Sequence, residues 1–233
     1  MHFGHKIGVV IPALNEEKSI GRVLSDIPDW VDEVIVADNG SEDATASVAE
    51  AHGARVVKQP KRGYGAACLK GIAALQPCDI VVFIDGDYSD HPDEMDGLVA
   101  PIIEDKADLV IGSRVRGALA MGALTPQQIF GNWLACRLMA IFWKAEFSDL
   151  GPFRAIRSRS LEAIGMADEN FGWTVEMQIK ALRSGLRCDE IPVSYRERIG
   201  VSKVSGTIKG SVLAGYTILR VIGQSAWTSR GEG

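Results

Sequence analysis

The feature that most constrains the fold of this chain is an alternation of short apolar runs with stretches long enough to form a helix. The apolar runs lie at residues 7–11, 33–37, 54–57, 80–84 and 109–111. Runs such as VIVAD and DIVVFID are apolar at successive positions, which is typical of strands covered on both faces. The rhythm predicts an α/β fold with a doubly wound, mostly parallel sheet and helices on both faces.

Polar side chains follow several of the expected strands. Asn15, Asp38, Asp85 and Asp87 all stand near the point where a strand ends. Because the carboxyl ends of parallel strands form the ligand-binding edge of such a sheet, we expect these four residues to meet in one crevice.

Size and charge narrow the functional classes. A chain of 233 residues fits one domain. The 25 Lys and Arg against 30 Asp and Glu give a net charge of −5, which argues against a general nucleic-acid binder. The cysteines form no CxxC pair, so we expect reduced, cytosolic thiols rather than a zinc or redox motif.

Targeting and membrane-spanning signals are not found in the sequence. The N-terminus MHFGHKIGVV lacks the basic, apolar and small-residue regions of a secretory signal. The longest apolar stretches, at residues 129–143 and 211–223, are shorter than the roughly 18–20 residues needed to span a bilayer. We therefore expect a cytoplasmic protein.

The common nucleotide-binding glycine motifs are missing. No GxGxxG follows the first strand and no GxxxxGK[ST] occurs, which argues against dinucleotide-dependent oxidoreduction and P-loop chemistry. Gly63 and Gly65 follow the third strand, where a turn or the start of a helix is the simpler interpretation.

The segment IDGDYSD is the most informative motif. Asp85 and Asp87 follow a buried strand with only Gly86 between them. This spacing directs two carboxylates toward one hard cation, and such oxygen ligands suit Mg²⁺ or Mn²⁺ beside a diphosphate. The alternative is a turn whose Asp residues cap the helix that follows.

The order of several motifs carries a family resemblance. VVIPALNEE, VIVADNGSEDAT, KRGYGAACLKGI, IDGDYSDHP and LVIGSRVRG follow one another at strand ends. Together they resemble the family 2 glycosyltransferases of the GT-A fold, especially the branch of dolichyl-phosphate mannose and glucose synthases. The resemblance covers about residues 6–205. It implies one glycosyltransferase domain over residues 1–233, with a nucleotide-sugar half (6–115), an acceptor half (116–205) and a C-terminal helix (206–233).

The resemblance assigns the donor site. It implies that the metal is held by Asp85 and Asp87, with Asp85 also facing the ribose or sugar. It implies nucleotide contacts from Pro12, Leu14, Asn15, Glu16, Asp38, Gly63, Asp85 and Gly86. A buried carboxylate can accept hydrogen bonds from a base imide and ribose hydroxyls, which helps select the nucleotide. For Glu16 the alternative is a charge that complements a helix N-terminus.

The phosphate-binding cations are also assigned by resemblance. Arg114, in the segment GSR, is expected near a phosphate or the donor sugar, and RERIGVSKVSG resembles a family segment that implies Arg198, Ser202 and Lys203 close over phosphate. A guanidinium is a planar, permanently charged fork suited to phosphate. The alternatives are a surface ion pair for Arg114 and a solvated basic face for the later cluster.

The segments SDLGPFRAIR and FGWTVEMQIKAL place Asp149 and Glu176 on the expected acceptor side. A hydroxyl acceptor needs a general base, which either carboxylate could supply. A lipid phosphate, with a second pKa near 6, is already anionic and needs none. Either carboxylate could instead orient basic residues or the metal.

The stretch 129–143 is apolar around almost its whole circumference as a helix. It must be covered by the same domain, by a second copy in a homodimer, or by a membrane surface beside a polyprenyl tail. Gln127 and Gln128 precede it, where a lipid phosphate would favour cations.

Taken together, these features predict an inverting, metal-dependent hexosyltransferase. We expect it to use a GDP-mannose or UDP-glucose type donor, a polyprenyl phosphate acceptor and Mg²⁺ or Mn²⁺, with peripheral contact at the inner face of the membrane. The alternatives are a soluble hydroxyl acceptor, a nucleotidyltransferase that releases pyrophosphate, and a non-catalytic nucleotide-binding protein.

Overall fold

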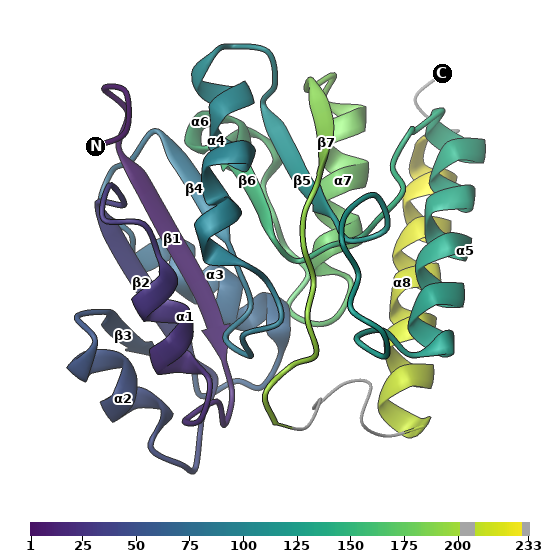
Figure 1. Ribbon diagram of the computed structural model, residues 1–233. Coiled ribbons are helices and arrows are strands. Elements are labelled where there is room, and N and C mark those ends of the chain that lie inside the picture. The colour runs from purple at the N-terminus through teal and green to yellow at the C-terminus, as the bar shows by residue number, and fades with distance from the viewer. Residues whose placement is uncertain (201–207, 230–233) are drawn as a thin grey trace.

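The protein is built on one seven-stranded sheet (Figure 1). The computed structural model describes residues 1–200 and 208–229, with side chains described for 1–200 and 213–227. The sheet order is β3-β2-β1-β4-β6-β5-β7. The strands are β1 (Ile7–Ala13), β2 (Glu33–Asp38), β3 (Arg55–Lys58), β4 (Ile80–Phe83), β5 (Leu109–Ser113), β6 (Arg154–Arg157) and β7 (Cys188–Pro192).

Helices follow most strands, as the alternation in the sequence predicts. They are α1 (Ile20–Asp26), α2 (Thr45–Ala51), α3 (Tyr64–Ala74), the 3₁₀ turn η1 (Pro92–Glu94), α4 (Met95–Ile103), α5 (Pro126–Trp143), α6 (Ser158–Ile164), α7 (Trp173–Arg183) and α8 (Ile208–Ser229). The expected fold class, a mostly parallel α/β sheet, is confirmed.

One strand runs against the others. β6 pairs antiparallel with both β4 and β5, whereas the remaining pairs are parallel. Arg154, at the start of β6, lies opposite Phe83 at the end of β4. The chain that precedes β6 therefore enters the sheet at the edge where β4 and β5 end.

The last strand of the sheet is short. β7 covers Cys188–Pro192, so only the first residues of the strand-like segment EIPVSYRER, residues 190–198, belong to the sheet. Beyond it, Tyr195 forms a bridge with Asp90. Residues 195–199 thus leave the sheet and run beside the loop after β4.

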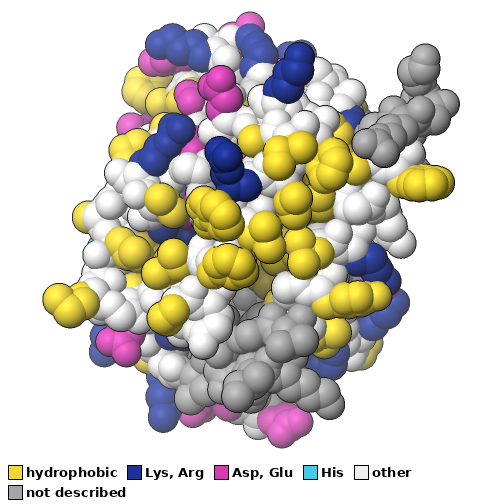
Figure 2. All heavy atoms as spheres, turned by 90° about the vertical axis from the view of Figure 1, so that its right-hand side faces the viewer, with side chains coloured by type: hydrophobic (Ala, Val, Ile, Leu, Met, Phe, Trp, Pro, Cys, Tyr) yellow, Lys and Arg dark blue, Asp and Glu magenta, His cyan; other side chains and the backbone are white. Residues whose placement is uncertain are grey.

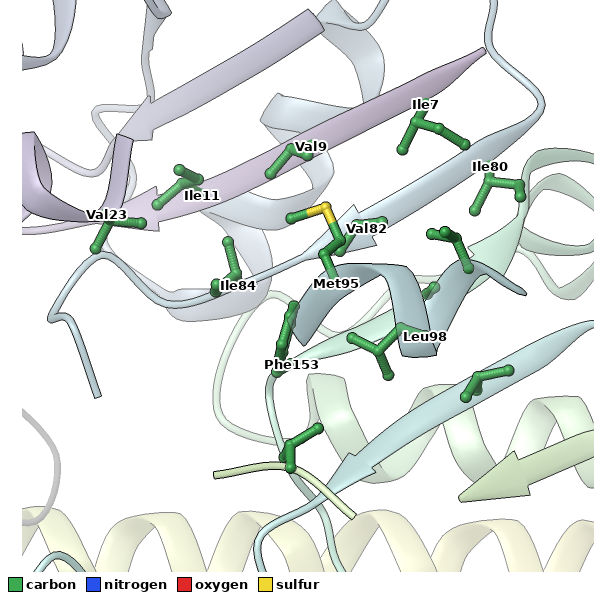
Figure 3. Packing of buried hydrophobic residues seen from close by; sticks show 14 of the residues in the cluster. Ile7, Val9, Ile11, Val23, Ile80, Val82, Ile84, Met95, Leu98 and Phe153 are labelled. Atoms are coloured by element: carbon green, nitrogen blue, oxygen red, sulfur yellow. The ribbon is translucent and has the colours of Figure 1, made fainter. Parts of the chain in front are cut away.

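Two cores cover the two faces of the sheet. Successive residues of β1 point to opposite sides, so Ile7, Val9 and Ile11 belong to one cluster and Val10 to the other. On the first face Met95 and Leu98 of α4 pack over these β1 residues (Figure 3). On the second face α3, α6 and α7 supply the cover, with residues such as Cys68, Leu161, Trp173 and Met177.

Helices α5 and α8 form an extra layer beside α7, at the right of Figure 1. The apolar stretch 129–143, treated as a helix in the sequence, lies within α5. This helix begins with a capping box, in which Gln128 and Thr125 exchange hydrogen bonds of 2.8 and 3.3 Å, and it ends at Lys144, whose φ is 55°. Among the described helices none is long and apolar enough to cross a bilayer.

Candidate functional site

A pocket of about 490 Å³ lies where the carboxyl ends of β1, β4 and β5 meet α5 and α8. It unites residues far apart in the sequence. Of the residues singled out by sequence reasoning, the pocket is lined by Pro12, Leu14, Glu16, Gly63, Asp85, Gly86, Asp87, Arg114 and Arg198.

The other selected residues lie elsewhere. Ser202 and Lys203 fall outside the described residues. The residues that do not line the pocket are Asn15, Asp38, Asp149 and Glu176. The expected meeting of four strand-end side chains in one crevice therefore holds for Asp85 and Asp87 but not for Asn15 and Asp38.

Asn15 and Asp38 build the loop beside the pocket. Asn15 has a φ of 53°, and its Oδ1 accepts a hydrogen bond of 2.8 Å from the N–H of Glu42. The Oδ1 of Asp38 accepts one of 2.9 Å from the N–H of Ser41. Both side chains are thus engaged by the turn after β2, and their predicted contact with a nucleoside stays a prediction.

Asn39 lines the pocket where Asp38 was expected. Its Nδ2 donates to the carbonyl oxygens of Gln59 and Lys61 at 3.0 and 2.7 Å, and its Oδ1 accepts from the N–H of Gly63 at 2.8 Å. This one side chain fixes the loop between β3 and α3. The available signal was the ADNG turn sequence, in which an Asn directly after a strand is suited to binding backbone groups.

Gly63 is required by close packing as well as by its backbone conformation. Its φ is 148°, and a Cβ atom there would lie 2.1 Å from the carbonyl oxygen of Glu169. Any larger residue would push the start of α3, and with it Tyr64, away from the pocket.

Asp85 is paired with the half-buried phenol of Tyr64. The hydroxyl of Tyr64 donates a hydrogen bond of 2.9 Å to Asp85 Oδ1. Burial raises the pKa of Asp85, against the opposing effect of Arg198 and of the Tyr64 hydrogen bond. Burial also holds the pKa of Tyr64 well above its usual range, so this hydroxyl remains a donor.

The two carboxylate oxygens of Asp87 have different partners. The side chain is 2% exposed. Its Oδ1 accepts hydrogen bonds from the N–H and the hydroxyl of Ser89 at 2.9 and 2.5 Å. Its Oδ2 has no hydrogen-bond donor within the described part of the chain, and the guanidinium of Arg198 lies in contact with it.

These two aspartates fit a divalent cation shared with a substrate. The residues described contain no group of three or more His, Cys, Asp or Glu side chains arranged around one metal. Mg²⁺ is commonly held in proteins by one or two carboxylates together with substrate phosphates and water. The buried carboxylate of Asp87, beside the second carboxylate of Asp85 in one pocket, matches that pattern.

Arg114 is held in place by hydrogen bonds to Asp149, which does not line the pocket. Its Nε and Nη2 donate to the two carboxylate oxygens at 2.8 and 2.7 Å, and its backbone N–H adds a bond of 2.8 Å. Although burial acts to lower the pKa of Arg114, Asp149 outweighs it and the pKa is raised. The guanidinium also lies 5.0 Å from the centre of the Tyr195 ring.

The segment that carries Asp149 is tied to three neighbouring elements. Asn132 of α5 donates to the carbonyl oxygen of Ser148 at 3.0 Å. Gln178 of α7 donates to that of Asp149 at 3.0 Å, and the Glu190 carboxylate of β7 accepts from the N–H of Asp149 at 3.0 Å. The position of Asp149 is thus determined by contacts remote in sequence.

Glu176 lies on the far side of α7 from the pocket. Its carboxylate accepts hydrogen bonds from the N–H groups of Ala167 and Asp168 and pairs with Lys180 at 2.9 Å. These contacts hold the loop before α7. The structure therefore brings neither of the two base candidates, Glu176 and Asp149, into the pocket.

Asp90 is a buried acid that sequence reasoning missed. It is 1% exposed, and burial raises its pKa to about 8. It follows the Asp85–Asp87 loop and forms a bridge with Tyr195. Its burial could not be read from the sequence, because Asp90 resembles a solvated turn residue.

The comparison with known families agrees with this geometry. The family model described as glycosyl transferase family 2 matches residues 8–165, from β1 to the end of α6. The chain belongs to glycosyltransferase family 2. Membership confirms the resemblance drawn from the motifs and makes the protein a hexosyltransferase, so the nucleotidyltransferase and non-catalytic alternatives fall away.

Curated relatives of this family 2 glycosyltransferase cover nearly its full length. An uncharacterized glycosyltransferase of Mycobacterium tuberculosis is 38% identical over 94% of this chain and 99% of the relative. A dolichyl-phosphate hexose transferase of Haloferax volcanii is 35% identical over 92% and 93% of the two chains. An undecaprenyl-phosphate mannosyltransferase of Micrococcus luteus is 29% identical over 91% and 93%.

Solved structures share the fold. Glucosyl-3-phosphoglycerate synthase of Mycobacterium tuberculosis, in complex with Mn²⁺, UDP and phosphoglyceric acid, superposes with a TM-score of 0.77 at 27% identity. The match covers 96% of this chain and 79% of the synthase. The same synthase bound to Mn²⁺, UDP-glucose and phosphoglyceric acid gives a TM-score of 0.76.

Proposed function

We propose that this glycosyltransferase moves a hexose, with inversion, from a GDP-mannose or UDP-glucose type donor to a polyprenyl phosphate. The observation that carries the proposal is the shape of the pocket. One cavity runs from Asp85 and Asp87 to α5 and α8, where Gln127, Gln128 and Asn132 of α5 give polar lining and Ala214 and Ile218 of α8 give apolar lining. The charged end suits the diphosphate of a nucleotide sugar, and the end at α5 and α8 suits an amphiphilic acceptor.

The donor end of the pocket is suited to a nucleoside diphosphate. Pro12 and Leu14 supply apolar contact, and Asn39 and Gly63 shape the adjacent loop. A cation, Mg²⁺ or Mn²⁺, is assigned to Asp85 and Asp87. When bound, it would neutralise charge on the departing nucleoside diphosphate.

Arg114 and Arg198 supply positive charge for two phosphate groups. Both line the pocket. Arg114 is preorganised by Asp149, which removes much of the entropic cost of orienting the fork. Asp149 acts here as a positioning residue, through Arg114.

The acceptor is favoured to be a phosphate rather than a hydroxyl. A hydroxyl acceptor needs a base within hydrogen-bond reach. The described carboxylates that line the pocket are Glu16, Asp85 and Asp87, all at the donor end. A phosphate monoester is already anionic near neutral pH and attacks without giving up a proton.

An apolar tail fits between α5 and α8. Gly131 of α5 and Ala214, Gly215 and Ile218 of α8 line the pocket there. A Cβ atom at Gly131 or Gly215 would meet nothing within 4 Å. These positions therefore leave open space, bounded by apolar side chains of α8 and by Gln127, Gln128 and Asn132 of α5, and its α8 side suits a polyprenyl chain.

The outer face of the same helices supports peripheral membrane contact. Figure 2 shows apolar side chains gathered on this side of the molecule, with Lys and Arg side chains nearby. The exposed large apolar residues on the two helices are Ile129, Phe130, Trp133, Ile141, Phe142, Leu213, Tyr216, Leu219 and Trp227. Patches of this kind mark interaction surfaces, and a bilayer would supply the polyprenyl acceptor directly.

Filling the space between α5 and α8 tests the acceptor assignment. Gly131→Leu and Gly215→Leu should abolish hexose transfer to a polyprenyl phosphate in detergent while leaving binding of the nucleoside diphosphate with Mn²⁺ within about twofold. Gly223→Leu is the matched control, because Gly223 is an open position on α8 that does not line the pocket. Unchanged transfer by both blocked variants would rule out this route for the tail.

A soluble hydroxyl acceptor, which in this case would also carry a phosphate group, is the second candidate. It is favoured by the similarity to glucosyl-3-phosphoglycerate synthase bound to phosphoglyceric acid. Assays with each donor should compare a polyprenyl phosphate with 3-phosphoglycerate. Transfer to 3-phosphoglycerate that survives in Gly131→Leu would favour the soluble acceptor.

A further inference from the structure

Residues 195–199 are held alongside the loop that carries the metal-binding aspartates. The N–H of Arg196 donates to the carbonyl oxygen of Ser89, and that of Ile199 donates to the carbonyl oxygen of Asp87, both at 2.9 Å. The Nε of Arg196 also donates to the carbonyl oxygen of Tyr88 at 2.6 Å. These bonds fix the main chain on both sides of residue 198, so its side chain can move while its backbone stays in place.

Arg198 uses this position to cover one atom of Asp87. Since Oδ1 already accepts two hydrogen bonds from Ser89, Oδ2 is the oxygen open to a ligand. The Arg198 guanidinium contacts Oδ2 without the geometry of a hydrogen bond. Arg198 also lies close enough to Asp85 to stabilise its ionised form.

We propose that Arg198 is an exchangeable counter-ion that occupies the cation position on Asp87 Oδ2 and swings to the substrate phosphates when a divalent cation binds. The inference rests on the proposed role of Asp87 in holding that cation. It adds that cation binding and phosphate binding are coupled through one side chain of this chain.

The exchange follows from charge. A 2% exposed carboxylate is costly to bury without a positive partner. Because the guanidinium and a divalent cation repel each other at contact distance, a cation on this oxygen weakens the hold of Arg198 on it. Arg198 is 30% exposed, so it has room to leave, and a diphosphate or phosphomonoester offers it a bidentate partner.

The coupling has a direction. In the donor-free protein Arg198 competes with the cation, so binding of the cation alone is weakened. With a nucleoside diphosphate present, the released guanidinium gains a phosphate partner, so the same cation binds more tightly. By linkage, the cation must strengthen nucleotide binding by the same factor.

Mn²⁺ binding to the intact protein, measured by the electron paramagnetic resonance signal of free Mn²⁺, tests the proposal without any turnover. Arg198→Ala should bind Mn²⁺ alone about tenfold more tightly than the wild type, corresponding to about 1.4 kcal/mol. The gain in Mn²⁺ affinity on adding UDP or GDP should be at least about fivefold smaller in Arg198→Ala than in the wild type.

Two further variants separate the possible failures. Arg62→Ala removes one positive charge from the same pocket, but Arg62 pairs with Glu42 at 3.7 Å rather than with Asp87. It should change Mn²⁺ affinity less than about twofold. Asp87→Asn should lose most Mn²⁺ binding.

The outcomes are distinct. If Asp87→Asn loses Mn²⁺ but Arg198→Ala does not gain it, the exchange is overturned while the metal site stands. If Arg62→Ala tightens binding as much as Arg198→Ala, the effect is general electrostatics and the exchange is again overturned. If Asp87→Asn binds Mn²⁺ normally, the proposed metal site fails, and the exchange with it.

Discussion

The guanidinium of Arg114 lies on the carboxylate of Asp149 through two parallel hydrogen bonds of 2.8 and 2.7 Å. Asp149 is completely buried, whereas the Arg114 side chain keeps 12% of its surface exposed on the pocket side. Asp149 thus belongs to the protein interior, whereas Arg114 belongs to the pocket. The pair therefore fixes the orientation of Arg114, the residue proposed to bind phosphate.

We expect Asp149→Asn to raise the KM for the nucleotide sugar about tenfold and to destabilise the protein. Breaking a buried ion pair leaves an uncompensated charge and costs about 3–5 kcal/mol. Steady-state kinetics and thermal unfolding measure the two effects. Asp105→Asn is the control, since Asp105 pairs with Arg157 at 3.0 Å at the surface and its loss should change neither quantity appreciably. Equal effects of the two variants would contradict the prediction.

Tyr64→Phe should weaken Mn²⁺ binding severalfold, and more strongly at lower pH. The Tyr64 hydroxyl stabilises ionised Asp85, so its removal raises the pKa of Asp85 further, and the protonated carboxyl is a poor ligand. Titration with Mn²⁺ at several pH values is the measurement. Tyr88→Phe is the matched control, because its hydroxyl bonds Asp26 at 2.7 Å. The two affinities should converge as pH rises.

The buried acid Asp90 should make stability depend on pH. Its pKa is about 8 in the folded protein and near 4 when unfolded, so between these values the unfolded chain holds fewer protons. Stability therefore falls as pH rises from about 4 to about 8. Asp90→Asn should remove this fall and raise the Tm at pH 8 by at least about 3 °C in EDTA.

The control for this prediction is Asp93→Asn, because Asp93 is 72% exposed and close in sequence. It should leave the Tm unchanged at pH 5 and pH 8. A gain for Asp90→Asn that is equal at both pH values would show that the carboxyl does not titrate between them.

The exposed face of α5 and α8 should bind anionic vesicles. The double substitution Phe130→Gln and Trp133→Gln removes two side chains that are 61% and 55% exposed. Burial of one large apolar side chain contributes about 1.5–3 kcal/mol, so we expect vesicle partitioning to fall at least tenfold in a sedimentation assay. Phe3→Gln is the control, since Phe3 is 78% exposed near the N-terminus, far from α5 (Figure 1). Equal losses would indicate non-specific adsorption.

Local patterns were sufficient to predict β1 to β5 and the position of Asp85 and Asp87 at a strand end, but not β6 or the bounds of β7. The apolar runs at 7–11 and 80–84 are fully buried strands, and IDGDYSD places Asp85 and Asp87 at a strand end by backbone geometry alone. Pro126 similarly marks the first residue of α5, because its missing N–H costs nothing there.

The acceptor end could not be predicted in the same way. Whether Asp149 meets a substrate or Arg114 depends on contacts from α5, α7 and β7, which are remote in sequence. Glu176 sits in the first turn of α7, and only the packing of that helix decides that its carboxylate faces Ala167 rather than the pocket. Side-chain orientation on a helix is set by tertiary packing.

The reversed strand β6 also affects how such a protein can change over generations. A forward strand delivers to the pocket edge only the loop that follows it, whereas β6 delivers the loop that precedes it. The loop of residues 144–153 therefore reaches the pocket edge between the two aspartates after β4 and the arginine after β5. Insertions or deletions there that keep Asp149 and its contact with Arg114 would reshape this side of the pocket while the loop that carries Asp85 and Asp87 stays unchanged.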